Sequence, residues 1–85
     1  MMPRYFFHLR DGAHRLDATG AELPDHDAAR EAAGAFLANH LRAGSAAIWS
    51  DDGLCLEVAD ANGLILFSLH VVPVEAPAMR QGPDR

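Results

Sequence analysis

Residues 54–72 read LCLEVADANGLILFSLHVV, and this stretch decides the fold. Apolar and polar side chains alternate on both sides of Asn62-Gly63, the dipeptide that most strongly signals a β-hairpin turn. A four-residue loop in place of a two-residue one would slide the partners by two positions but keep every side chain on its face. With Asn62 and Gly63 as the loop, the expected pairs are Ala59 with Leu66, Val58 with Phe67, Glu57 with Ser68, Leu56 with Leu69, Cys55 with His70 and Leu54 with Val71.

A second strand is predicted at the amino terminus, where RYFFHLR (residues 4–10) alternates in the same way. Asp11-Gly12 is a dipeptide that suits a two-residue hairpin turn, so residues 13–16 are predicted to return as a short strand. The stretch DATGAELPD (residues 17–25) predicts a loop. It ends at Asp25, a natural helix N-cap.

A helix is predicted from His26 to about Arg42, because apolar residues recur at spacings of three and four. Asp27 in its first turn and Arg42 in its last turn suit the helix dipole, and Gly44 supplies a stop. Residues 43–53 form a connector. The helical face that we expect to meet the sheet holds Ala29, Ala32, Ala33, Phe36, Leu37, His40 and Leu41.

The predicted fold is α+β, in the order β-β-α-β-β, with an antiparallel-rich four-stranded sheet and one helix packed on one face. A 17-residue helix is roughly 25 Å long and a seven-residue strand about 23 Å, so one helix covers one face and no more. We expect a single domain over residues 1–74 and a flexible tail over residues 75–85.

The two faces of the predicted sheet differ in composition. The covered face is expected to hold Tyr5, Phe7, Leu9, Leu54, Leu56, Val58, Ile65, Phe67, Leu69 and Val71. The uncovered face is expected to hold Phe6, His8, Arg10, Cys55, Glu57, Ala59, Leu66, Ser68 and His70. Phe6 and Leu66 make this second face more apolar than a solvated sheet requires. Exposed apolar area of this kind marks a contact surface. The alternatives are that isolated exposed apolar residues are ordinary, or that the Ile48-Trp49 segment folds over them.

The leading hypothesis is therefore a non-catalytic module that binds a protein partner or a second copy of itself, a dimer being expected. The expected contact residues on the open face are Phe6, His8, Leu66, Ser68 and His70. A free sheet edge that pairs through its backbone is the alternative contact. If both histidines lie in the contact, association weakens on acidification.

A second hypothesis is a small metal-dependent or thiol-based enzyme centred on Cys55, His8 and His70, whose side chains are all ligand types for a zinc-like ion. None of them has the short spacing of a metal motif. Cys55 and His70 also fit a nucleophile and its base, but no orienting group or oxyanion-hole loop is identifiable. The sequence therefore assigns no catalytic residue and predicts no cofactor.

Composition restricts the function classes. The chain has 85 residues, a net charge of -5, seven scattered arginines and no lysine, which disfavours binding to nucleic acid. Cys55 is the only cysteine, so no internal disulfide forms. No apolar run approaches the roughly 20 residues of a membrane span, and the amino terminus lacks a signal-peptide pattern. A cytoplasmic protein is expected.

Three stretches, PRYFFHLRDG (3–12), DATGAELPD (17–25) and AAREA (28–32), resemble an uncharacterised family of short bacterial proteins, a domain of unknown function. Its members open with a P-R-Y-F-F strand, continue through a G-x-E-L-P-D loop into an alanine-rich helix, and end in a hairpin. The resemblance covers residues 3 to about 72. It implies the same fold and a bacterial, cytoplasmic setting, and it carries over no activity, cofactor or catalytic residue.

A looser likeness links the chain to HicB-type antitoxin domains, whose small sheet and single helix bind a partner toxin. The chain departs from that pattern because it lacks an appended DNA-binding segment. An antitoxin-like partner-binding domain is the third hypothesis, and it rests on similarity of architecture alone.

Overall fold

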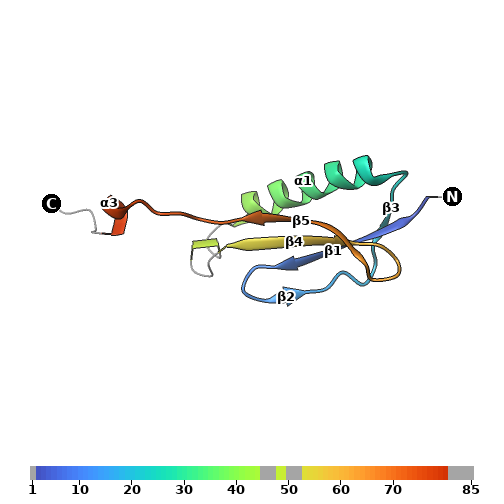
Figure 1. The fold of residues 1–85 in the computed structure, drawn as a ribbon, viewed down its shortest axis with the longest axis horizontal. Coiled ribbons are helices and arrows are strands. Elements are labelled where there is room, and N and C mark those ends of the chain that lie inside the picture. Colours follow the sequence, from blue (N-terminus) through green and yellow to red (C-terminus); the bar gives the residue numbers. More distant parts are fainter. Residues whose placement is uncertain (1, 45–47, 50–52, 81–85) are drawn as a thin grey trace.

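The structure, a computed structural model, describes residues 2–44, 48–49 and 53–80. It has one long helix and an antiparallel sheet in the order β2-β1-β4-β5, with the short β3 also paired to β1 (Figure 1). This confirms the predicted α+β class and the order of the main elements. The elements are β1 (Arg4–Arg10), β2 (His14–Arg15), β3 (Ala21–Glu22), α1 (His26–Ala43), β4 (Leu54–Ala59), β5 (Ile65–Val71) and α3 (Pro77–Arg80).

The core lies between α1 and one face of the sheet. Alternate side chains of β1 and β4 point into it, as their sequence pattern predicts. Ala29 and Ala33 are fully buried, which lets the first half of α1 approach the sheet closely. The buried cluster consists of Tyr5, Phe7, Leu9, Ala29, Ala33, Leu37, Ile48, Leu54, Leu56 and Val58.

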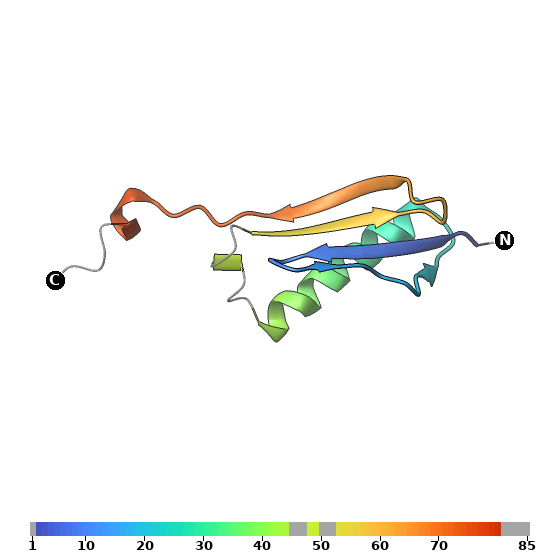
Figure 2. The same cartoon turned by 90° about the horizontal axis from the view of Figure 1, so that it is seen from below.

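Helix α1 crosses the sheet diagonally (Figure 2). Its first turns lie behind β4 and β5, and its last turns lie beyond β1 and β2. The helix therefore leaves part of β5 uncovered on the core side. Phe67, Leu69 and Val71 on β5 pack against the core cluster but are only half-buried, whereas their partners on β4 are buried.

The first hairpin and the loop after it differ from the prediction. Arg10 pairs with His14, so the hairpin loop has three residues rather than two, and the returning strand is shorter than residues 13–16. Residues 21–22, predicted as loop, form β3 and pair with Arg4 and Tyr5. The sheet therefore has five strands rather than four, because this segment adds a second short strand beside β1.

The second hairpin confirms five of the six predicted pairs, from Val58 with Phe67 to Leu54 with Val71. The sixth is wrong, because Ala59 pairs with Ile65 rather than Leu66. The Asp60 carboxylate accepts hydrogen bonds from the N–H groups of Asn62 and Leu64, and the Asp60 N–H donates to the Leu64 carbonyl. The loop between the paired residues 60 and 64 is thus three residues long, and a bulge after Ile65 restores the predicted register.

Because of this bulge, two of the predicted face assignments are wrong. Ile65, predicted to lie on the covered face, pairs with Ala59 and is 51% exposed. Leu66, predicted to lie on the uncovered face, is half-buried and packs against the core cluster. Ala59 itself is only 2% exposed, although α1 lies on the other side of the sheet.

The ends of α1 follow the predicted signals. The Asp25 side chain accepts a hydrogen bond from the Ala28 N–H at 2.8 Å, and the Gly44 N–H donates to the His40 carbonyl. Phe36, predicted to face the sheet, is partly exposed and stacks on Phe7.

The connector and the tail are described only in part. Ile48 joins the core rather than folding over the open face, and Trp49 is exposed, while residues 45–47 and 50–52 lie outside the described residues. In the predicted tail the structure has the four-residue helix α3, and residues 81–85 lie outside the described part. No helix in the described ranges is both long and apolar enough to cross a bilayer.

Candidate functional site

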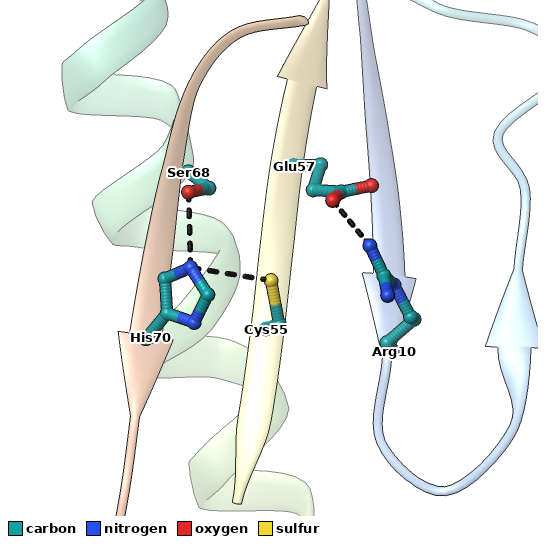
Figure 3. Close-up of polar contacts among 5 residues, drawn as sticks. All are labelled: Arg10, Cys55, Glu57, Ser68 and His70. Carbon is teal, nitrogen blue, oxygen red and sulfur yellow. Dashed lines mark hydrogen bonds and ion pairs between the residues drawn. The ribbon is translucent and has the colours of Figure 1, made fainter.

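The open face, which is the face of the sheet away from α1, carries Arg10 on β1, Cys55 and Glu57 on β4, and Ser68 and His70 on β5 (Figure 3). Cross-strand pairing places Arg10, Cys55 and His70 in one row of the sheet. His8, Glu57 and Ser68 form the next row.

Cys55, Ser68 and His70 meet at one ring nitrogen. The Nε2 atom of His70 lies 3.6 Å from the Cys55 sulfur and 3.0 Å from the Ser68 hydroxyl oxygen. Ser68 and His70 are two residues apart on β5, so their side chains share a face, and Cys55 is the direct partner of His70 on β4. The predicted approach of Cys55 to His70 is thus present in the structure.

Two features of the described residues around this arrangement differ from those of a thiol-enzyme site. Ser68 and His70 are exposed on the surface of the sheet, so water reaches the Cys55–His70 pair freely. Cys55 lies in mid-strand, where its backbone N–H takes part in pairing with β1, so it offers no donor for an oxyanion. Arg10, its neighbour in the same row, forms an ion pair with Glu57.

His8 does not join Cys55 and His70. Its Nδ1 atom accepts a hydrogen bond from the Asp17 N–H at 3.1 Å, and its ring stacks on Phe6 with the centroids 6.4 Å apart. His8 is therefore held toward the connection between β2 and β3, at the other side of the face. Among the described residues, no three side chains of His, Cys, Asp or Glu lie close enough to hold a metal ion.

Asp17 organises this side of the sheet. Its carboxylate accepts hydrogen bonds from the N–H groups of Phe7, Thr19 and Gly20, at 3.1, 3.0 and 3.1 Å. Burial raises the pKa of Asp17, but the hydrogen bonds from the three N–H groups, with a smaller electrostatic effect of the nearby His8 ring, outweigh burial and leave the pKa below its ordinary value. The side chain replaces the backbone partner that β1 lacks between β2 and β3, so it has a structural role.

Sequence reasoning missed a polar cluster around the buried side chain of Asp11. The Asp11 side chain is 5% exposed and lies 3.3 Å from His40 Nε2 and 3.4 Å from Arg15 Nε. A groove of about 390 Å³ runs beside it, between β1, the β2–β3 connection and the second half of α1. The one available signal was the position of His40 in the predicted sheet-facing stripe of the helix.

The outer edge of β5 is unpaired within the described residues, since β5 ends the strand order. The Phe7 N–H points away from β4, toward Asp17, so Phe7 and its partner Val58 are a non-hydrogen-bonded pair. The backbone groups of Val58 therefore point toward β5 and bond Phe67. Because these directions alternate along a strand, Ser68 and His70 present their N–H and C=O groups outward.

Exposed apolar side chains also gather at both ends of this edge. Residues 64–74 read LILFSLHVVPV and contain no charged side chain. Leu64, Ile65, Val72 and Val74 are all more than half exposed. Exposed apolar side chains thus follow one another along the flanks of β5, whereas Leu16 and Trp49 are exposed elsewhere and Phe6 on the open face is half-buried.

The described residues define a small α+β domain with one long helix that crosses the sheet diagonally and with an edge strand, β5, that is unpaired among them. The chain belongs to the family of a domain of unknown function, DUF6894, whose model matches residues 4–72. That match confirms the resemblance to an uncharacterised family. No curated protein and no solved structure matches the chain.

Proposed function

We propose that this domain is a non-catalytic protein-interaction module that binds its partner through the outer edge of β5. The observation that carries the proposal is the combination of outward backbone groups at Ser68 and His70 with an uncharged, apolar strand. Monomeric proteins usually protect edge strands with charged side chains, proline, bulges or a covering segment. Along β5 the regular part from Phe67 to Val71 carries no charge, and Pro73 comes only after the strand has ended.

Backbone pairing gives such a contact its affinity, and side-chain pockets give it specificity. An extended partner segment would add a strand to the sheet beside β5. The half-buried Phe67, Leu69 and Val71 would gain cover on the core side from the side chains of that strand. An antitoxin-like domain that holds a partner toxin would be one version of the same module.

The open face is a weaker candidate than the β5 edge for the surface that binds the partner. Its groups are largely paired with one another, in the Arg10–Glu57 ion pair and the contacts of His70. Leu66, one of the two apolar residues expected there, packs against the core cluster. A double variant of the open face, Phe6→Asp with Leu66→Asp, would therefore damage the core as well as the face, so a variant at the β5 edge is the cleaner test.

The test uses Ser68→Pro, which removes an outward N–H without removing a bond to β4. The full-length wild type and this variant are immobilised, exposed to lysate of the source organism, and compared by quantitative mass spectrometry. The proposal predicts a specific protein, or the chain itself, that binds the wild type and is lost from the variant. Equal binding of the same proteins to both would refute the β5 edge as the contact.

A further inference from the structure

We infer that the partner at the β5 edge is a second copy of this chain, which pairs antiparallel with its own β5 to form a symmetric dimer with a continuous sheet. This inference rests on the proposed function and names its partner. Antiparallel pairing of a strand with itself generates a two-fold axis, and a two-fold axis closes the assembly at two subunits.

The regular part of β5 sets the position of the axis. The bulge after Ile65 disturbs the strand on one side, and Pro73 lacks an N–H on the other. Residues 67–71 lie between these limits, and Leu69 is their midpoint. Since the backbone groups of Leu69 point toward β4, an axis at Leu69 makes it a non-hydrogen-bonded pair with its copy.

In this register the strand is complementary to itself. Phe67 lies opposite the partner's Val71, and Leu69 opposite the partner's Leu69, so the half-buried core-side stripe meets an identical stripe. On the open face Ser68 lies opposite the partner's His70, and both can hydrogen-bond. The hydrogen-bonded backbone pairs are formed by these same two residues, whose N–H and C=O groups point outward.

The charge distribution permits a second copy at this edge. Each chain carries a net charge of -5, which opposes association in general. The strand that forms the contact carries no charged residue, so pairing brings no like charges directly across the axis. The nearest charged pair on the open face, Arg10 with Glu57, is already neutralised within its own subunit.

The inference is tested on the purified full-length chain by sedimentation velocity from low micromolar to high micromolar concentration. At high micromolar concentration the wild type is expected to sediment with the mass of a dimer. Ser68→Pro and His70→Lys are each expected to be monomeric at the same concentration. Ala35→Lys, which adds the same charge on an exposed position of α1, is the matched control and should remain dimeric. Far-ultraviolet circular dichroism checks that each variant is folded.

The outcomes separate this inference from the proposed function. A wild type that stays monomeric throughout overturns the self-pairing inference but leaves the lysate comparison to decide the proposed function. A dimer that survives both Ser68→Pro and His70→Lys overturns the β5 contact itself. If Ser68→Pro fails to fold, His70→Lys against Ala35→Lys decides alone.

The register has its own test. In a Cys55→Ala background, Leu69→Cys places two thiols across the axis, where non-hydrogen-bonded Cα atoms are about 4.5 Å apart and within disulfide range. Mild oxidation is expected to give a covalent dimer of Leu69→Cys. The control, Leu64→Cys in the same background, lies far from the axis and should stay uncrosslinked. A dimeric Leu69→Cys that does not crosslink would overturn this register.

Discussion

Replacing Asp17 by asparagine is predicted to loosen the segment between β2 and β3 from β1. The two carboxylate oxygens of Asp17 accept different hydrogen bonds. Oδ2 accepts one from the Phe7 N–H, and Oδ1 accepts one each from the N–H groups of Thr19 and Gly20. An asparagine supplies only one acceptor oxygen. Whichever way its amide is turned, an NH₂ group then faces at least one backbone N–H, and two donors cannot bond each other.

The magnitude follows from the bonds that are lost. A hydrogen bond to a charged group contributes roughly 1.5–3 kcal/mol, and water can replace part of this at Thr19, which is exposed. The expected loss in the free energy of unfolding is about 1–2 kcal/mol for Asp17→Asn, which keeps one acceptor. It is about 2–4 kcal/mol for Asp17→Ala, which leaves all three N–H groups without this partner.

The effect depends on pH in a defined direction. Folding lowers the pKa of Asp17 below its ordinary value of 3.8. The stabilisation by its carboxylate is therefore fully present above that value and is lost as the pH falls through the lower pKa of the folded state. The wild type should lose its advantage over Asp17→Asn in that acidic range, and the two unfolding free energies should converge.

Urea titrations at neutral pH and at a series of acidic pH values measure both quantities. Glu31→Gln, at an exposed position of α1, is the control for removing one negative charge and should change the stability little. The reasoning would be refuted if Asp17→Asn matched Glu31→Gln at neutral pH, or if its difference from the wild type persisted unchanged into acid.

Further predictions concern packing and can be measured by the same denaturant titrations. Gly53→Ala should destabilise the fold by about 2–4 kcal/mol, because Gly53 has φ +119° and an added Cβ would lie 2.5 Å from the Val71 carbonyl oxygen. Gly34→Ala should instead stabilise it by about 0.5–1 kcal/mol, since nothing lies within 4 Å of that Cβ in the middle of α1. Leu56→Ala, in the fully buried centre of β4, should cost about 2–5 kcal/mol, whereas Leu64→Ala at the exposed flank should stay within about 0.5 kcal/mol. A Gly53→Ala protein as stable as the wild type, or a Leu56→Ala protein no weaker than Leu64→Ala, would contradict the packing described here.

The sequence predicted the parts of the fold that depend on local pattern. Alternation along residues 4–10 and 54–59 identified β1, β4 and their buried faces, since the side-chain period of a strand is fixed by its backbone. The capping role of Asp25 followed in the same way, because the capping bond is made within one turn.

The parts that depend on contacts between distant segments were not predictable in this way. β3 exists because Ala21 meets Tyr5, and its two residues carry no strand pattern of their own. The role of His8 depends on Asp17, which reaches β1 from the loop. The bulge at Ile65 arises from the Asp60 side chain within the turn, which changed the loop length that Asn62-Gly63 suggests.

The sequence predicted the part of the candidate site that depends on local pairing, and missed the part that depends on the packing of distant segments. The approach of Cys55 to His70 followed from their shared row once the hairpin register was known. The exposed apolar edge could not be located from residues 64–74 alone. Its position depends on the strand order and on the diagonal path of α1, and both are set by the packing of the whole domain.

The most direct test of the central claim is residue-resolved amide hydrogen exchange of the full-length chain at high concentration. If the outer edge of β5 is a pairing surface, the N–H groups of Ser68 and His70 should be protected to a similar degree as those of Phe67 and Leu69, which bond β4. In the His70→Lys variant, protection of Ser68 should fall while that of Phe67 and Leu69 remains. Fast exchange of Ser68 and His70 in the wild type at every concentration would show a free edge and contradict the claim.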